Sequence, residues 1–503
     1  MADTSITPEE VDFPEQLRIR REKRAGLLER GVEPYPVSVP RTKSLTRIRV
    51  IYSDLAIDVV TGDIESVTGR IIFKRDTGKL CFATLRDGDG ATLQAMISLD
   101  KVGEESLASW KSDIDLGDIV SVTGEIITSK RGELSILAND WALASKSLRP
   151  LPNEHRPMSE ETRVRMRYVD LIVRPEARSN ARLRPAVMRS LRDTYHARDY
   201  LEVETPMLQV QPGGAAARPF KTYSNAYDMD LFLRIAPELF LKRCVVGGIE
   251  RVYEINRNFR NEGADSSHSP EFAMIESYEA YGDWRTVANL TRDLVQNAAM
   301  DVFGSHVVTH HNGSESDLGG TWREISLFDA ISEGIGETVT ALTPMEELKK
   351  YADRLGIKVD PSWINGKLAE EIFEHLIAAK KLNEPTFVMG FPTDNAPLVR
   401  AHRSIPGVVE KWYLYVVGFE LATGYSELID PVIQRERLVE QARLGAKGDV
   451  EAMSVDEDFL RAMEFGMPPM GGMGMGVDRL LMALTGLGIR ETILFPFVKP
   501  EID

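Results

Sequence analysis

The sequence predicts an α+β protein with at least two domains. Between about residues 65 and 143, short β-like runs are separated by glycine turns. Two prolines, Pro150 and Pro152, then mark a linker. Beyond the linker, helical runs alternate with strand-like segments, but without the regular spacing that a Rossmann unit requires. Because 503 residues are too many for one core, we expect a small all-β domain followed by a larger α+β domain.

Composition limits the class of protein. The chain has 43% apolar and 27% charged residues, as ordinary soluble proteins do. Its formal charge of −16 argues against a protein that coats nucleic acid or membranes non-specifically. The two cysteines, Cys81 and Cys244, are far apart and lack the spacing of a zinc site, which fits a reducing cytosol. With neither a signal-peptide pattern nor a charge-free apolar run long enough to cross a bilayer, we expect a cytoplasmic protein with no membrane partner.

The segment from Glu15 to Arg30 is predicted to be an exposed helix with a basic cluster. Two interpretations are open: the cluster contacts a phosphate backbone, or it is a solvated face balanced by neighbouring glutamates. The β-like region that follows is predicted to be a barrel resembling the OB fold, which binds single-stranded nucleic acid. The basic helix and the barrel together form a predicted domain over residues 1–149.

Arg70, Phe82 and Gln94 lie on successive predicted strands of this barrel. In such barrels an aromatic side chain stacks on a base, while amides or guanidinium groups read base edges. Phe82 is the natural stacking platform. The alternative is that Phe82 belongs to the core and that the two polar side chains are ordinary surface residues.

The larger domain is predicted over residues 161–503, after a linker at 150–160. A more helical stretch at about 340–385 is predicted to be an insertion into it. Three other segments concentrate unusual side chains: 200–220, with Pro206, Gly213 and Gly214; 233–281, with FRNEG, HSPEF and ESY; and 470–488, with closely spaced glycines before Arg479. The second segment is expected to fold as strand, loop and strand, so that one sheet face presents several of its polar groups.

The strand-like segment from Gly418 to Leu428 carries two glutamates among apolar residues. In a flat strand, Thr423, Tyr425 and Glu427 point to one face and Glu420 to the other. Buried carboxylates are costly unless a cation or a donor meets them. We therefore expect either a positively charged ligand at this strand or an edge strand with solvated glutamates.

Taken together, these motifs resemble those of the class II aminoacyl-tRNA synthetases of the lysine-specific kind, in their actinobacterial form. The three class motifs are EVETP with Pro206, FRNE with Arg260 and Glu262, and GMGMGVDRL with Arg479, and they occur in the expected order. The class I signatures HIGH and KMSKS are absent. The resemblance runs along nearly the whole chain and implies an OB-fold barrel joined to a catalytic domain with an antiparallel sheet and flanking helices.

The resemblance implies a function and a set of site residues. The chain would activate L-lysine with ATP as lysyl-adenylate and transfer lysine to tRNA(Lys), working as a homodimer. The implied lysine site comprises Gly214, Glu238, Arg260, Glu276, Tyr278, Thr423, Tyr425 and Glu427. The implied ATP site comprises Arg260, Glu262, His268, Phe272, Glu420 and Arg479, with Arg260 and Arg479 as the catalytic cations. Arg70, Phe82 and Gln94 would read the anticodon.

The resemblance also implies Mg²⁺ as cofactor, held by Glu420. Relatives generally have a second acid seven residues earlier, where this chain has Tyr413, and a phenol is a poor magnesium ligand at neutral pH. Two other interpretations follow from the sequence: a synthetase-like regulator that binds RNA or lysine with weakened catalysis, and a ligase that lysylates lipid or protein. The intact adenylation motifs disfavour the first, and the anticodon-type barrel disfavours the second.

Overall fold

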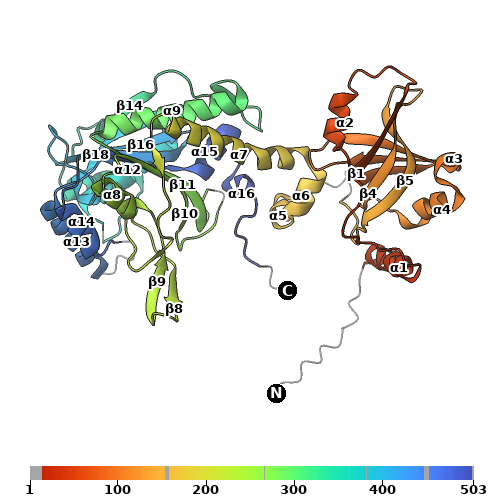
Figure 1. Ribbon diagram of the computed structural model, residues 1–503. Helices are drawn as coiled ribbons and strands as arrows, with labels where there is room; N and C mark the ends of the chain where they lie inside the picture. Colours follow the sequence, from red (N-terminus) through yellow and green to blue (C-terminus); the bar gives the residue numbers. More distant parts are fainter. Residues whose placement is uncertain are drawn as a thin grey trace. The chain divides into compact units, whose positions relative to one another are not determined.

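The computed structural model describes residues 14–152, 158–265, 267–361, 363–380, 382–446 and 452–500. The chain divides into two compact units, Met1–Ser179 and Asn180–Asp503 (Figure 1). Residues 153–157 of the predicted linker lie outside the described residues, and the predicted boundaries at 149 and 161 stay predictions. In the described part of the chain, every helix is too short or too polar to cross a membrane.

The first unit contains a closed five-stranded barrel in the order β1-β2-β3-β5-β4. Inward positions alternate with outward ones along each strand, and side chains such as Ile71, Leu85, Ile97 and Ile136 are fully buried. The strands are β1 (Val60–Asp76), β2 (Leu80–Arg86), β3 (Thr92–Ser98), β4 (Ile119–Thr128) and β5 (Leu134–Ser145). The helices are α1 (Glu15–Glu29), α2 (Leu45–Ile51), α3 (Leu99–Val102), α4 (Glu104–Asp113), α5 (Glu160–Arg165) and α6 (Arg167–Val173).

The basic helix α1 is attached to the barrel unit by two of its cations. Arg20 is buried and donates to the carbonyl oxygens of Leu116 and Ser147, at 2.9 Å each. Lys23 donates to Asp115 at 2.6 Å. These two cations therefore hold the helix in place. The helix is confirmed, but only part of its basic cluster is available to a phosphate backbone.

The second unit is built on an eight-stranded sheet in the order β14-β15-β16-β17-β18-β11-β10-β6. Its neighbours pair antiparallel, except that β14 with β15 and β10 with β6 are parallel. The strands are β6 (Leu201–Glu202), β10 (Arg251–Phe259), β11 (Glu271–Ala280), β14 (Arg323–Ser326), β15 (Thr386–Pro392), β16 (Val408–Val416), β17 (Phe419–Ser426) and β18 (Met470–Gly476). Smaller sheets contain β7 (Leu208–Gln209), β8 (Lys221–Ser224) and β9 (Met229–Leu233), and β12 (Val307–Thr309) and β13 (Glu315–Asp317).

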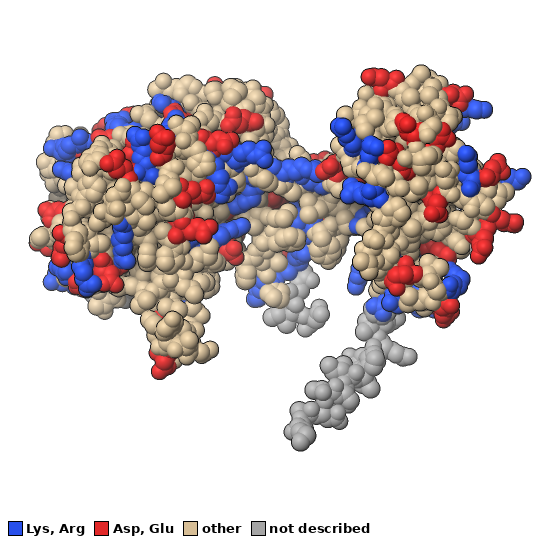
Figure 2. Space-filling view, in the orientation of Figure 1, with Lys and Arg blue, Asp and Glu red and all other residues tan. Residues whose placement is uncertain are grey.

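Helices pack against this sheet around three buried clusters. Long helices α7 (Pro175–His196), α9 (Trp284–Phe303) and α15 (Val477–Thr485) enclose the largest cluster, which includes Leu191, Leu294 and Trp412. A second cluster joins α10 (Leu327–Ile335), α11 (Met345–Leu355) and α12 (Asn365–Lys380) to β15 and β16. The third cluster joins α8 (Glu238–Val246) to α13 (Pro431–Ala446) and α14 (Glu457–Glu464). The short helix α16 (Ile489–Thr492) follows α15 in the chain. On the face seen in Figure 2, acidic and basic side chains are interspersed over both units.

Candidate active site

The floor of the site is a strand with almost no side chains on one face. Gly472 of β18 pairs with Tyr278 of β11 on one side and with Tyr425 of β17 on the other. A Cβ atom at Gly472 would overlap Oε1 of Glu427 and lie 2.5 Å from Cε1 of Tyr278. Glycine is therefore required here, because any side chain would occupy the space in which the carboxylate and the two phenols meet.

The next glycine along β18 forms the middle of the floor. Gly474 pairs with Glu276 on β11 and with Thr423 on β17. A Cβ atom at Gly474 would contact the side chains of Met274 and Glu276 at 3.2 and 3.5 Å. The antiparallel register thus aligns one polar position of each flanking strand beside each glycine, and the strand, loop and strand predicted for this segment are confirmed as β10, a loop and β11.

A cavity of about 400 Å³ lies over this floor. All but one of the residues implied for lysine line it: Gly214, Glu238, Arg260, Glu276, Tyr278, Thr423 and Tyr425. Gly214 has a φ of +87°, and a Cβ there would lie 2.9 Å from Cβ of Glu238. The exception is Glu427, which is buried next to the cavity without lining it.

Glu427 is instead bound to a lysine of the chain itself. The ammonium group of Lys242 lies 2.5 Å from Oε2 of Glu427 and 2.6 Å from Oε1 of Glu238, and the side chain of Lys242 has no exposed surface. Glu238 also accepts the hydroxyl of Tyr425 at 2.8 Å through its second oxygen. Burial lowers the pKa of Lys242, but Glu238 and Glu427 outweigh it and leave the pKa above its ordinary value.

Glu276 is the buried carboxyl of the cavity without a bound cation among the described residues. The hydrogen bond that it accepts from the hydroxyl of Tyr278 is long, at 3.5 Å. Burial, with a further contribution from Glu238, raises the pKa of Glu276 well above its usual range, although Arg260 opposes this rise. An empty cavity therefore favours the neutral form of Glu276, whereas a bound ammonium group would favour the carboxylate.

The expectation that Glu420 points to the face opposite to Thr423 and Tyr425 is wrong. The β16–β17 pairing has an irregularity at Leu414/Tyr415, where Tyr415 pairs with Glu420 but Leu414 pairs with Ala422. This shift brings Glu420 into the same cavity as Thr423 and Tyr425. Glu420 therefore belongs to the polar cavity, and the edge-strand interpretation is wrong because β17 is paired on both sides.

Tyr413 lies opposite Thr423 and faces the same cavity. Its hydroxyl oxygen accepts a hydrogen bond from Nζ of Lys411 at 2.8 Å. Burial raises the pKa of Tyr413 well above its usual range, so the phenol stays neutral. In the part of the chain that the structure describes, no cluster of three or more His, Cys, Asp or Glu side chains is arranged to hold a metal ion. Glu420 is the cavity carboxylate that could share a cation with bound phosphates, which suffices for Mg²⁺ because this ion commonly keeps its waters.

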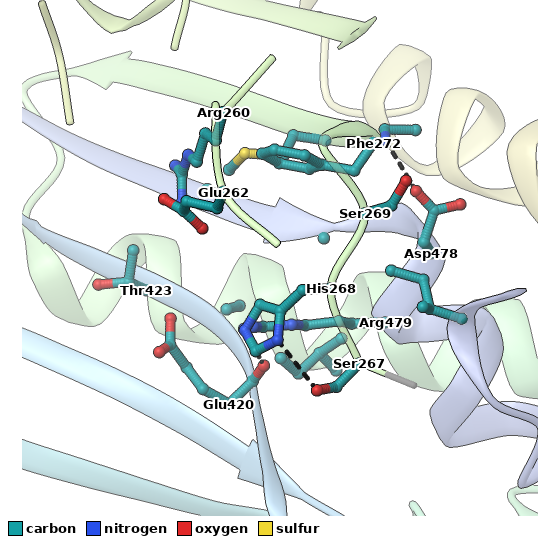
Figure 3. A pocket seen from close by; sticks show the side chains of 17 residues that line it. Arg260, Glu262, Ser267, His268, Ser269, Phe272, Glu420, Thr423, Asp478 and Arg479 are labelled. Carbon is teal, nitrogen blue, oxygen red and sulfur yellow. Dashed lines mark hydrogen bonds between the residues drawn. The ribbon is translucent and has the colours of Figure 1, made fainter. Parts of the chain in front are cut away.

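A second cavity, of about 150 Å³, adjoins the first. The two cavities share five lining residues: Arg260, Met274, Glu420, Thr423 and Gly474. Figure 3 shows Phe272 and Arg479 on opposite sides of this cavity, with Glu262 and His268 also reaching into it. The six residues implied for ATP, Arg260, Glu262, His268, Phe272, Glu420 and Arg479, all line it. An aromatic ring and a guanidinium group on opposite sides of a cavity are the groups between which a flat base can stack.

Two arginines provide the positive charge of this second cavity. The guanidinium of Arg260 lies 5.1 Å from the ring centre of Phe272, and its buried Nε has no hydrogen-bond partner among the described residues. Burial lowers the pKa of Arg260, and the carboxylates of Glu262, Glu276 and Glu420 oppose this change. Arg479 donates to the carbonyl oxygen of Glu420 at 2.8 Å. An anion between the two arginines would satisfy the unpaired donor.

Arg70, Phe82 and Gln94 all lie on the outside of the barrel, because the residues that flank each of them point inward. Phe82 pairs with Met96 and Gln94 pairs with Thr84, which makes Phe82 and Gln94 diagonal neighbours on one face. Gln94 donates to Ser135 at 2.9 Å. The alternative that Phe82 belongs to the core is therefore wrong, since its side chain is only partly buried and its ring lies 5.1 Å from the guanidinium of Arg75. Arg70 lies farther along and donates to the carbonyl oxygen of Gly117 at 2.6 Å.

Sequence reasoning missed five charged residues of the site: Lys242, Lys367, Glu370, Glu374 and Lys411. Lys242 could have been found, because it lies four residues after Glu238 on a helix and so on the same face. Lys411 lies two residues before Tyr413 on β16 and therefore on the same face of the strand. Glu370 of α12 also lines the first cavity, accepting from Asn395 at 2.9 Å, but no local sequence signal connects this helix with the site.

Comparisons with known proteins agree with this geometry. Residues 159–499 match the family model described as tRNA synthetases class II (D, K and N), and residues 65–144 match the OB-fold nucleic acid binding domain. The chain belongs to the class II tRNA synthetases. Within that class it falls in the lysine–tRNA ligase family, because it is 65% identical over 491 residues to the lysine–tRNA ligase of Kineococcus radiotolerans, covering 97% of this chain and 98% of that protein.

Two further relatives are similar to this chain over nearly its whole length. The lysine–tRNA ligase 1 of Mycobacterium tuberculosis H37Rv is 59% identical over 496 residues, covering 97% of this chain and 98% of the relative. The lysylphosphatidylglycerol biosynthesis bifunctional protein LysX of Rhodococcus jostii is 45% identical over 506 residues, covering 100% of this chain but 44% of that protein. The predicted fold, an OB-fold barrel with a class II synthetase domain, is confirmed.

Replacing Glu276 by Gln should stabilise the ligand-free protein at pH 8 by about 1–3 kcal/mol, while weakening lysine binding. Because the folded-state pKa of Glu276 is raised, the native protein binds more protons than the unfolded chain, and stability falls as pH rises above about 4.5. Urea unfolding at pH 5 and pH 8 measures the effect. Exposed Glu271 on the same strand is the control, and Glu271→Gln should change stability by less than about 0.5 kcal/mol. If both variants changed the free energy of unfolding equally, the raised pKa assigned to Glu276 would be contradicted.

Proposed function

We propose that this chain activates L-lysine with ATP and transfers it to the 3′ end of tRNA(Lys). The observation that carries the proposal is one cavity lined by buried carboxyl groups and by Arg260, beside a second cavity with two guanidinium groups and an aromatic ring. Lysine carries two ammonium groups and one carboxylate, and it complements the first cavity. The names of the relatives at 59–65% identity support the same substrate.

Within the first cavity, Gly214 and Glu238 receive the α-amino group and Arg260 receives the carboxylate. Glu276 and Tyr278 meet the side-chain ammonium, with Thr423 and Tyr425 completing the wall and Glu427 behind it. A cation leaving water needs opposite charge and acceptors at its destination, and buried Glu276 supplies both. Aspartate would bring an anion to the same carboxyl groups, so the cavity discriminates by repulsion as well as by attraction.

In the second cavity, the adenine of ATP stacks between Phe272 and Arg479, with Glu262 at its exocyclic amine and His268 near the phosphates. The lysine carboxylate, ionised at neutral pH, attacks the α-phosphorus in line and pyrophosphate leaves. No side-chain nucleophile is needed. Arg260 lines both cavities, and it therefore holds the attacking carboxylate while offsetting charge on the α-phosphate. In the second step, a ribose hydroxyl of the tRNA attacks the adenylate carbonyl and AMP leaves.

Glu420 would hold Mg²⁺ together with the phosphates of ATP. Bound there, the ion supplies positive charge that offsets the charge of the departing pyrophosphate. Glu420 borders both cavities, and Arg479 is hydrogen-bonded to its backbone carbonyl, which leaves the carboxylate itself available. Tyr413, neutral and hydrogen-bonded to Lys411, contributes no charge to the ion.

The first test is lysine-dependent exchange of pyrophosphate into ATP by the purified protein, with aspartate and asparagine as comparisons, across a Mg²⁺ titration. Exchange with lysine alone is expected, because the cavity carboxyl groups repel aspartate and asparagine lacks the cation. Folded protein that gives no exchange with lysine would contradict the proposed activity.

We also propose that the barrel reads the anticodon of the tRNA through Arg70, Phe82 and Gln94. Their shared outward placement and the partly exposed side chain of Phe82 support this role. Because a base stacked on an aromatic ring contributes about 1–3 kcal/mol, Phe82→Ala should lower tRNA charging by roughly 5- to 150-fold. Pyrophosphate exchange should be unchanged. Phe465→Ala, which removes an exposed ring of the other unit, is the control and should alter neither activity. A loss of exchange in the Phe82 variant would point to misfolding instead of lost recognition.

We further propose that the protein works as a homodimer in the cytoplasm, where its tRNA substrate is found. The segment around the first class motif exposes four apolar side chains within ten residues, Leu201, Met207, Leu208 and Val210. Such a cluster fits an apolar contact with a second copy.

Leu208→Glu combined with Val210→Glu should convert the dimer to a monomer at micromolar concentration, because two buried carboxylates would face apolar partners. Light scattering coupled to size-exclusion chromatography measures the mass. The double variant Leu494→Glu/Phe495→Glu, which changes exposed apolar residues near the carboxyl end, serves as control. A monomeric wild-type protein would overturn the dimer proposal.

A further inference from the structure

Phe73 is an aromatic residue of the barrel that the proposed function leaves without a role, although 53% of its surface is exposed. Regular alternation along β1 from the fully buried Ile71 would place Phe73 in the barrel interior. The β1–β2 pairing instead contains a bulge, because Ile71 pairs with Leu85 and Phe73 pairs with the adjacent residue of β2, Thr84. The extra residue, Ile72, therefore turns Phe73 to the outside of the barrel.

The bulge brings Phe73 onto the face that is proposed to read bases. Thr84 pairs with Phe73 on one side and with Gln94 of β3 on the other, so these three residues form one outward row. Phe82 lies two residues before Thr84 on β2, which makes Phe73 and Phe82 diagonal neighbours on the same face. Side chains in this relation lie about 7–8 Å apart. The barrel therefore presents two aromatic side chains next to each other beside Gln94.

The separation of the two aromatic side chains suits bases that are not stacked on each other. Successive nucleotides along one strand of a duplex are about 3.4 Å apart, roughly half the separation expected for Phe73 and Phe82. Two neighbouring bases can therefore rest on both rings only after they have unstacked from one another. Unstacked bases of single-stranded loops are the ones that proteins bind on aromatic side chains.

The charge of this face favours RNA over an apolar protein partner. Although the chain as a whole carries a formal charge of −16, the outward positions over residues 70–75 of β1 and 82–86 of β2 include no acidic residue and three arginines, Arg70, Arg75 and Arg86. Guanidinium groups beside aromatic rings suit a phosphate backbone that carries unstacked bases. An apolar partner would instead bury these cations without supplying an anion.

We infer that Phe73 is a second stacking platform of the barrel and holds the base next to the one that stacks on Phe82. This inference rests on the proposed anticodon-reading role of the barrel and extends it from one stacked base to two adjacent ones. The ring of Phe73 offers a flat apolar face without a hydrogen-bonding group. Phe73 therefore adds affinity for an unstacked base without selecting which base is bound.

Binding of a hairpin RNA with the anticodon loop of tRNA(Lys) to the full chain tests the inference, with fluorescence anisotropy as the readout. Phe73→Ala and Phe73→Leu should each weaken binding by roughly 5- to 150-fold, as expected for the loss of one stacked base. Phe73→Tyr keeps a ring and should bind within about threefold of wild type. Lysine-dependent pyrophosphate exchange should be unchanged in all three variants. A Phe73→Leu variant that binds like wild type would overturn the inference, because an apolar side chain without a ring would then suffice.

A double variant distinguishes two stacked bases from one base shared by both rings. If Phe73 and Phe82 each hold a base, the losses caused by Phe73→Ala and Phe82→Ala should multiply in the double variant. Hairpins with a single abasic nucleotide then locate the bases: one position should abolish the effect of Phe73→Ala, and the adjacent position should abolish that of Phe82→Ala. A double variant that binds no more weakly than the weaker-binding single variant would overturn the inference, as would one abasic position that abolishes both effects.

Ile64 provides a matched control on the same strand. Its exposed fraction is also 53%, but it pairs with Glu125 of β4 and does not lie beside Phe82. Ile64→Ala should leave RNA binding unchanged. A loss equal to that of Phe73→Ala would mean that binding responds to any exposed apolar residue of β1, and this would overturn the inference.

Failure of the inference can be distinguished from failure of the proposed anticodon role. Normal binding by Phe73→Ala together with weakened binding by Phe82→Ala would overturn the inference alone. Wild-type protein that does not bind the hairpin, or a Phe82→Ala variant that binds it normally, would contradict the anticodon-reading role on which the inference rests.

Discussion

Three carboxyl groups can be buried around one small cavity only because an ammonium group of the chain is buried with them. Each carboxylate taken out of water would cost several kcal/mol if it stayed ionised and unpaired. Lys242 offsets this cost for Glu238 and part of it for Glu427, whose pKa burial raises to about 8, and protonation offsets it for Glu276 while the cavity is empty. The fold around the cavity depends on this cluster, because α8 and the end of β17 meet at it.

The two cavities share the groups on which adenylation depends. Arg260 borders both, so the same guanidinium can hold the carboxylate of one substrate and the phosphate of the other. This arrangement needs no large rearrangement between binding and attack, because the reacting atoms are brought together by a group that is already buried. A hydrogen bond holds α15 to β11 beside this site. Asp478, at the start of α15, accepts the backbone N–H of Ala273 at 2.7 Å and thereby fixes β11 next to Phe272.

Much of the fold and many of the site residues could be predicted from the sequence, because the informative residues lie in short local motifs. Turn glycines and alternating apolar residues indicate the barrel, and the FRNE and HSPEF segments lie on either side of one loop. Glu420 could not be placed, since the irregular pairing of β16 with β17 depends on the register of two strands. Glu370 could not be found, because α12 meets the cavity only through tertiary packing. Lys242 lies four residues after Glu238 in a predicted helix, but a lysine at this spacing from a glutamate more often forms a surface ion pair.

The glycine face of β18 restricts how such a site can change during evolution. Gly474 lines the substrate cavity, and a side chain at Gly472 would overlap the carboxylate of Glu427 and the ring of Tyr278 beside it. A new amino-acid specificity must therefore arise on the flanking strands β11 and β17 or on α8, where side chains can be exchanged without closing the cavity. Divergence at this site is confined to its walls, and relatives that accept different amino acids would retain the same bare floor beneath different side chains.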